Sequence, residues 1–278
     1  MAYKTLLTVL TRTQDAEGPL ASAVALARQN DAHLDVLCLG VDQTQLGYYY
    51  ESAAVFVQQS AIDRARAEAE EVLAAVRARL SAEDVRWSAE GVVAQTGSIG
   101  SLVAIRSRFA DLVVLPRPYG EERGQEAEVI LEAAIFEGQA PVLVLPEAPL
   151  AALPGRRVVL AWNQSDEALS AARKALPLLV AADRVVITVV DPPRHGAERS
   201  DPGGPLSQWL ARHGAKVEVA VLAGTMKISE VIARHARDID ADLIVMGAYG
   251  HSRLREAILG GATRNMLEKA DRPVLMAH

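Results

Sequence analysis

The chain alternates between short apolar runs and longer amphipathic segments. The apolar runs are rich in β-branched residues and carry apolar side chains at successive positions, as in residues 33–39, 184–190 and 242–246. Uninterrupted apolar runs of this length are typical of strands in a parallel sheet that is covered on both faces. The segments between them are long enough for helices, so the pattern predicts strands that alternate with helices.

Residues 61–80 carry the clearest helical pattern, because apolar side chains recur there at helical spacing while arginine and glutamate occupy other positions. Residues 165–180 and 228–238 are later segments of the same kind, and Pro177 is expected to end or kink the helix in which it lies. Alternating strands and helices predict a doubly wound, Rossmann-like α/β fold with a parallel sheet and right-handed crossovers. In such sheets ligands bind beyond the carboxyl ends of the strands.

The same pattern occurs twice. The run Asp111-Leu-Val-Val-Leu115 matches Asp242-Leu-Ile-Val-Met246, and Pro141-Val-Leu-Val-Leu145 matches Pro273-Val-Leu-Met-Ala277. Because matching segments recur in the same order, and because 278 residues suit two small domains, we expect two copies of one domain in tandem. The proline-rich segment between the copies disfavours helix and sheet, so we place the domains at residues 1–148 and 155–278.

Composition narrows the classes of partner. The net charge is −6 and no run of lysine or arginine occurs, which argues against a nucleic-acid-binding surface. Cys38 is the single cysteine and lies in an apolar run, so we expect a buried small side chain, not a reactive thiol. No apolar stretch approaches the length of a membrane-spanning helix and no signal-peptide pattern opens the chain, so we expect a cytoplasmic protein without a membrane partner.

A glycine-rich loop follows the apolar run at residues 242–246. Gly247 and Gly250 can let the backbone approach a ligand closely and can adopt positive φ. Gly260 and Gly261 precede a helical run, and the start of a helix favours an anion. Taken alone, this glycine spacing fits an anion site and a set of plain turns equally well.

The loop resembles the signature of the universal stress protein family, in which Gly-x2-Gly-x9-Gly-Ser/Thr wraps the phosphates and ribose of ATP. Gly247, Gly250 and Gly260 match this signature, and Gly261 stands where serine or threonine is usual. The resemblance covers both halves as a fold, but only the second half carries the motif. It implies a stress-response protein that binds ATP, or the related nucleotides ADP and AMP, with Mg²⁺ as an accompanying ion.

The resemblance assigns further residues. The acidic residue that follows the family's first strand corresponds to Asn163, which can form hydrogen bonds but has no charge. The family's valine at the end of the second strand, whose backbone meets adenine, corresponds to Val189. Trp162 is bulkier than the usual residue there and can either stack on a base or fill the pocket. The predicted nucleotide-binding residues are Asn163, Val189, Gly247, Gly250, His251, Arg253, Gly260, Gly261, Ala262 and Thr263.

The first half lacks the loop. Its last-but-one apolar run leads into Pro116-Arg-Pro-Tyr-Gly120, and alignment of the two halves sets Glu128 and Val129 opposite the final pair of glycines. A carboxylate would repel a phosphate there. Residues 11–14 also offer no acid at the end of the first strand. We therefore predict that this half does not bind ATP through the loop and that it holds another ligand or serves in dimerisation.

Three functions fit these residues. The first is a stress-response regulator in which nucleotide binding changes an interaction with a protein partner that the sequence does not identify. The second is a nucleotide-free adaptor or dimerisation module. The third is a weak ATPase, although no residue stands out as a general base, and neither a Walker motif nor zinc-ligand spacing occurs. Residues 142–145 and 274–277 are expected to pair inside the chain as a pseudo-dimer, and a homodimer of chains stays open.

Overall fold

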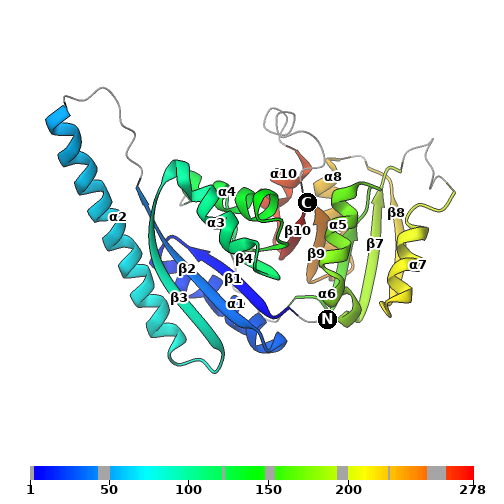
Figure 1. The fold of residues 1–278 in the computed structure, drawn as a ribbon. Coiled ribbons are helices and arrows are strands. Elements are labelled where there is room, and N and C mark those ends of the chain that lie inside the picture. The colour runs from blue at the N-terminus through cyan, green and yellow to red at the C-terminus, as the bar shows by residue number, and fades with distance from the viewer. Residues whose placement is uncertain are drawn as a thin grey trace. The chain divides into compact units, whose positions relative to one another are not determined.

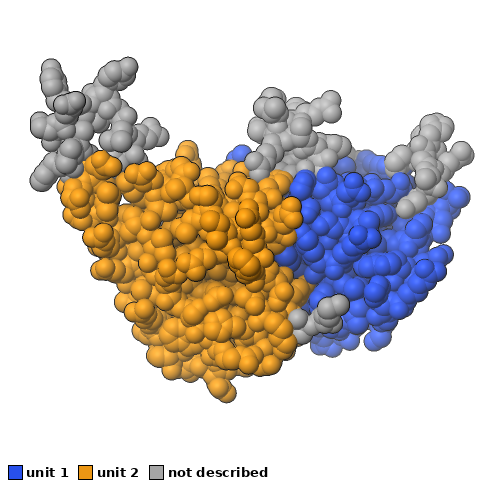
Figure 2. Space-filling model, viewed as in Figure 1, with its two compact units in different colours: residues 1–2, 141–278 blue, residues 3–140 orange. Residues whose placement is uncertain are grey.

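The structure is a computed structural model. It describes residues 3–42, 51–120, 123–147, 154–192, 200–224, 226–248 and 261–278, without side-chain detail for residues 51–57. The chain divides into two compact units, named in chain order the first unit, Tyr3–Ala140 (orange, unit 2 in the key of Figure 2), and the second unit, Pro141–His278 (blue, unit 1 in the key). The domain limits expected from the sequence, at residues 148 and 155, stay a prediction.

The first unit is a parallel sheet of four strands, with the order β3-β2-β1-β4. Each strand is followed by at least one helix, and α2, with 30 residues, is the longest (Figure 1). The elements are β1 Thr5–Leu10, η1 Thr13–Ala16, α1 Gly18–Asn30, β2 His33–Asp42, α2 Glu51–Leu80, β3 Arg86–Gln95, η2 Thr96–Ser98, α3 Ile99–Ser107, β4 Leu112–Pro116, α4 Gln125–Glu132 and the π-helical segment η3 Ala133–Glu137.

The described residues of the second unit form six strands in the order β8-β7-β6-β9-β10-β5, of which the first five are parallel. The described elements are β5 Val142–Leu145, β6 Arg157–Ala161, α5 Asp166–Lys174, α6 Leu176–Ala181, β7 Arg184–Val190, α7 Gly204–Arg212, β8 Val217–Leu222, α8 Ile228–Asp238, β9 Leu243–Gly247, α10 Ala262–Lys269 and β10 Val274–Ala277. The predicted α/β fold with parallel strands and alternating helices is therefore confirmed.

Burial explains why these strands could be recognised. Successive residues of a strand face opposite sides of the sheet, yet β4 is buried from Leu112 to Leu115 and β9 from Leu243 to Met246. Helices must therefore cover both faces of these strands, and only apolar side chains tolerate that position. The largest fully buried side chains of the chain are mainly leucine and isoleucine, so the core contains few aromatic rings.

Pro177 acts as predicted. Helix α5 ends at Lys174 and α6 begins at Leu176, with Pro177 in its first turn, where a backbone N–H has no acceptor within the helix. Helix α5 starts at a capped end, since the Ser165 Oγ accepts a hydrogen bond of 3.2 Å from the Ala168 N–H. The cap and the proline together set the length of the segment that packs on β9 and β10.

Strand β5 pairs with β10 in antiparallel register, with Val144 opposite Val274 and Val142 opposite Met276. All four residues of each strand are buried. The predicted pairing of residues 142–145 with 274–277 inside one chain is thus confirmed. It gives the apolar edge of β10 a partner, where an open edge would invite association with other chains.

No helix among the described residues is both long enough and apolar enough to cross a lipid bilayer.

Gly247, at the end of β9, leaves space for the start of α5. A Cβ atom on this residue would lie 2.6 Å from the backbone nitrogen of Ala168 and 2.7 Å from the carbonyl carbon of Glu167. Both contacts are with backbone, which cannot move aside without shifting the helix. Gly247 does not adopt the positive φ that its type allows, so packing, and not backbone conformation, requires glycine here.

Cys38 is buried in β2, as predicted, and its burial raises the pKa of the thiol to about 12. We expect no reaction with an aromatic disulfide reagent in the folded protein, because reaction needs an accessible thiolate. One thiol per chain should appear only when denaturant unfolds the first unit, and the absorbance of the released thiol measures it. Stoichiometric labelling of the native protein at the rate of a free thiol would contradict this burial.

The substitution Gly247→Ala should lower the free energy of unfolding by about 1–3 kcal/mol, because the added methyl group forces α5 away from β9. Chemical denaturation measures the change. Gly97→Ala is the matched control, since nothing lies within 4 Å of a Cβ at that position, and it should change stability by less than about 0.5 kcal/mol. Equal denaturation midpoints for the two variants would show that α5 does not depend on this glycine.

Candidate functional site

The strand order of the second unit reverses between β6 and β9. From β6 the chain continues to β7 on one side, whereas β9 lies on the other side of β6, in parallel register with Val158 opposite Leu243. The connecting loops therefore diverge above the carboxyl ends of these two strands, which is where doubly wound sheets bind ligands. Asn163 follows β6 closely and Gly247 ends β9, so the structure brings both predicted residues to this edge.

Helix α10 also begins at this edge, because it connects the parallel strands β9 and β10 and must run back along them. Gly261 is its N-cap, with φ −53° and ψ 167°, and no side chain caps the helix. The first turn contains no acidic residue. The prediction that Gly261 stands at a helix start is confirmed, and the helix presents backbone N–H groups and a positive dipole end to an anion.

Ala262 and Thr263 are the first two residues of α10. Thr263 is buried, with 2% of the residue exposed. Gly250, His251, Arg253 and Gly260 lie outside the described residues.

Asn163 has a local structural role. It is exposed, and its Oδ1 accepts a hydrogen bond of 3.2 Å from the backbone N–H of Ser165, which turns the chain into α5. The intervening Gln164 adopts the left-handed conformation with φ 64°. An asparagine serves this turn as well as an aspartate would, so the turn alone explains the residue type. The exposed amide still lies beside the carboxyl end of β6.

Val189 and Trp162 are both buried, with 3% and 8% of their surface exposed. The indole of Trp162 lies against Gly203, since a Cβ on that glycine would be 3.7 Å from the Trp162 Cδ1. Gly203 adopts φ 85° just before α7, which lets the chain pass this close. Trp162 was expected either to stack on a base or to fill the pocket. Its burial supports the second role, filling the space beneath the carboxyl edge of the sheet.

A link across the neighbouring loops was not foreseen. Asp191 follows β7 and Gly224 follows β8, and the Asp191 Oδ1 accepts a hydrogen bond of 2.9 Å from the Gly224 N–H. Asp191 adopts the left-handed conformation with φ 45° to make this contact. The carboxyl ends of β7 and β8 are thereby joined beside Val189. A lone aspartate after a strand gives no sequence signal for a partner 33 residues away.

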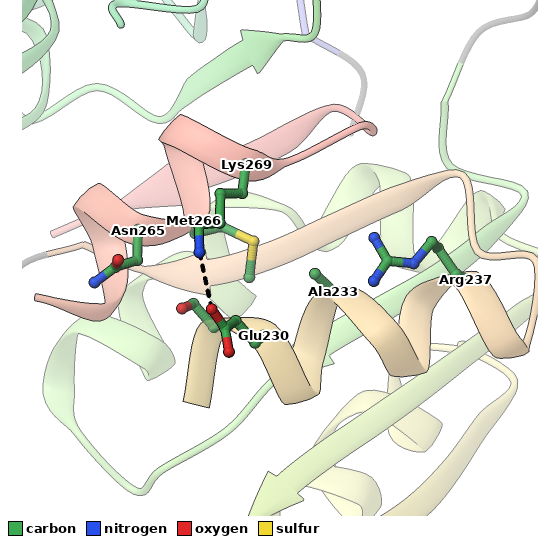
Figure 3. A pocket seen from close by; sticks show the side chains of 7 residues that line it. Glu230, Ala233, Arg237, Asn265, Met266 and Lys269 are labelled. Carbon is green, nitrogen blue, oxygen red and sulfur yellow. Dashed lines mark hydrogen bonds and ion pairs between the residues drawn. The ribbon is translucent and has the colours of Figure 1, made fainter. Parts of the chain in front are cut away.

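Helices α8 and α10 are joined by polar contacts that also escaped the sequence analysis. The Lys269 Nζ lies 2.9 Å from the Glu230 Oε1 (Figure 3), and this contact holds the pKa of Glu230 below its usual value. Nearer the start of α10, the Lys227 Nζ lies 3.4 Å from the Asn265 Oδ1, and the Asn265 Nδ2 donates to the Gly261 carbonyl oxygen at 3.1 Å. A chain of contacts thus runs from the N-cap of α10 to the start of α8.

Between the two helices lies a shallow groove of about 90 Å³. Ala233 and Met266 contribute its apolar part, and the Lys269–Glu230 ion pair and Arg237 border it (Figure 3). The groove is too small for a nucleotide, so the edge above β6 and β9 remains the candidate site.

The start of α4 in the first unit differs from the sequence alignment. The helix begins at Gln125 with Gly124 as its N-cap, so neither Glu128, at the end of the first turn, nor Val129 stands at the N-cap position that Gly261 has in α10. The alignment from Pro141 was wrong because α4 and η3 together are longer than α10, and residues counted back from the following strand fall too far along the helix. The first turn of α4 nevertheless contains two acidic residues, Glu126 and Glu128.

Comparison with known proteins agrees with this geometry. A family model described as "Universal stress protein family" matches residues 155–278. A universal stress protein of Synechocystis is 40% identical over 72 residues, which cover 26% of this chain and 24% of that protein. A universal stress protein of Methanocaldococcus jannaschii is 36% identical over 63 residues, covering 23% of this chain and 38% of that protein. The matches therefore span well under half the length of these two relatives.

Among solved structures, a universal stress protein from Archaeoglobus fulgidus has the same fold, with a TM-score of 0.72 and 18% identity over 99% of this chain and 96% of that chain. The likeness in fold thus extends over both units, whereas the family model matches the sequence of residues 155–278. Residues 155–278 therefore match the universal stress protein family, and over the whole chain the likeness to that Archaeoglobus protein is one of fold.

Proposed function

We propose that the second unit binds ATP or a related nucleotide at the carboxyl ends of β6 and β9, and that the chain acts as a stress-response regulator. The observation that carries the proposal is the start of α10: a glycine N-cap without an acid in the first turn, at the edge where a doubly wound sheet receives ligands. Phosphate groups would accept hydrogen bonds from the N–H groups of this turn.

The rest of the nucleotide would lie along the same edge. In this proposal Asn163 and Val189 border the base, and Gly247, Gly250, Gly260, Gly261, Ala262 and Thr263 surround the ribose and phosphates. His251 and Arg253 contribute charge from the loop, and Mg²⁺ accompanies the phosphates. Burial of Trp162 supports a pocket with a rigid floor beneath the base.

The contacts between α10 and α8 suggest how binding is communicated. A phosphate at the N-cap would change the surroundings of Asn265, which touches both Gly261 and Lys227. Because Lys227 is the N-cap residue of α8, the conformation at the start of α8 would respond to the ligand. We propose that a protein partner in the cytoplasm recognises this response. Such a switch requires that the nucleotide bind one of the two conformations more tightly than the other.

The variant Gly261→Asp should weaken nucleotide binding without unfolding the unit. Aspartate is a favourable N-cap, so α10 keeps its start, but the added carboxylate repels a phosphate and should weaken the affinity for Mg-ATP at least about tenfold. Isothermal titration calorimetry measures the affinity. Gly261→Ser is the matched control: it also caps the helix and adds the hydroxyl that the family motif contains, so it should bind as tightly as the wild type or more tightly.

Three outcomes are informative. Unchanged binding by Gly261→Asp would place the phosphates elsewhere. Equal loss in Gly261→Ser would mean that any side chain blocks the site. A wild-type protein that shows no heat of binding with millimolar Mg-ATP would refute the proposal and leave the nucleotide-free adaptor as the better description.

The first unit should not add a second nucleotide. The start of α4 carries Glu126 and Glu128, whereas the start of α10 carries no acid, so phosphate is repelled in one unit and attracted in the other. The same titration should therefore saturate at one nucleotide per chain. Saturation at two per chain would contradict the difference between the units.

A further inference from the structure

The first unit has a crevice of the same topology, between β1 and β4. These strands are adjacent and parallel, with Thr8 opposite Val114, while β2 lies on the other side of β1. The carboxyl ends of β1 and β4 therefore form the edge at which a doubly wound sheet would bind a ligand. The segment η1 follows β1 directly at this edge.

This edge contains a buried ionic cluster. Asp15, in η1, is 3% exposed. Its Oδ1 lies 3.0 Å from the Arg12 Nη2, and its Oδ2 lies 3.3 Å from the Arg12 Nε, so the guanidinium group of Arg12 holds both oxygens. The Arg123 Nη1 lies 3.0 Å from the Asp15 Oδ2. The side chains of Arg12 and Arg123 are 24% and 15% exposed, so both cations are largely withdrawn from solvent.

The position of Arg123 relates this cluster to the phosphate site of the second unit. Arg123 directly precedes Gly124, the N-cap of α4, just as the proposed phosphate position adjoins Gly261, the N-cap of α10. The Asp15 carboxylate is thus an anion bound by two arginines, one of which, Arg123, adjoins the N-cap of α4 and lies 108 residues from Asp15 in the sequence. Bidentate contacts of this kind are how arginine binds carboxylate and phosphate ligands.

A second carboxylate lies at the helix start itself. A Cβ atom on Gly124 would collide with the carboxylate oxygens of Glu126, so this side chain folds back against the N-cap. It occupies the region of the helix dipole that favours an anion. The two carboxylates of Asp15 and Glu126 match in number the two guanidinium charges of Arg12 and Arg123.

We propose that the first unit carries an anion site that is permanently filled by the chain's own Asp15. The carboxylate stands where a ligand's anionic group would bind, and Arg12 and Arg123 are its binding residues. This unit consequently needs no small anion to complete its fold and does not respond to one, so that ligand-dependent change is confined to the second unit.

Replacement of Asp15 by a free anion tests the proposal. Asp15→Ala removes the carboxylate that both arginines contact and should lower the melting temperature by roughly 10 °C in chloride. Formate has the size of the deleted group, so at equal ionic strength formate should restore part of this loss. The wild type should melt at the same temperature in both salts, because its site is filled.

Asp31→Ala is the matched control. Asp31 also pairs with two cations of the first unit, Lys4 and Arg86, but its side chain is 78% exposed. Water can replace it, so this variant should show no preference for formate. Wild-type stability of Asp15→Ala, or the same salt response in all three proteins, would overturn the proposal.

If Asp15→Ala does not fold in either salt, Asp15→Asn decides the question. It keeps the shape of the side chain and removes the charge, and its melting temperature should fall several degrees below that of the wild type. A melting temperature equal to that of the wild type would show that the arginines do not require an anion at this position.

Discussion

The structure depends on the burial of parallel strands on both faces. A strand in this position must be followed by a crossover helix, and each crossover helix must begin at the carboxyl edge of the sheet. The starts of α5, α8 and α10 therefore converge on one edge of the second unit, as do η1 and α4 in the first. Covering the core with crossover helices therefore places backbone N–H groups and polar loops at these edges, whether or not a ligand binds there.

The two units use this common geometry in different ways. In the second unit, α10 starts with a glycine and has no acid in its first turn. In the first unit, Asp15 and Glu126 place carboxylates beside the start of α4, and Arg12 and Arg123 bind one of them. Under the two proposals, the first unit satisfies its own electrostatics, whereas the second unit binds an external anion.

The fold could be predicted because burial acts on sequence directly. Strands enclosed on both faces must be apolar at successive positions, and Pro177 is tolerated at the first turn of a helix but not in its interior. The pairing of β5 with β10 was expected because their apolar edges would be open to other chains without a partner. Contacts between distant residues gave no such signal. Three such contacts form only once the sheet has assembled: the ion pair of Asp15 with Arg123, the hydrogen bond from Lys227 to Asn265, and the close approach of Gly247 to α5. The start of α4 was misplaced because the lengths of the corresponding helices differ between the repeats.

The most direct test of the account is mass spectrometry of the purified protein, first native and then denatured. The account predicts a native mass that exceeds the chain mass by one adenine nucleotide per chain, and release of that nucleotide as ATP, ADP or AMP on denaturation. A native mass equal to that of the bare chain, unchanged after incubation with Mg-ATP, would contradict it and would mean that the start of α10 serves the fold alone.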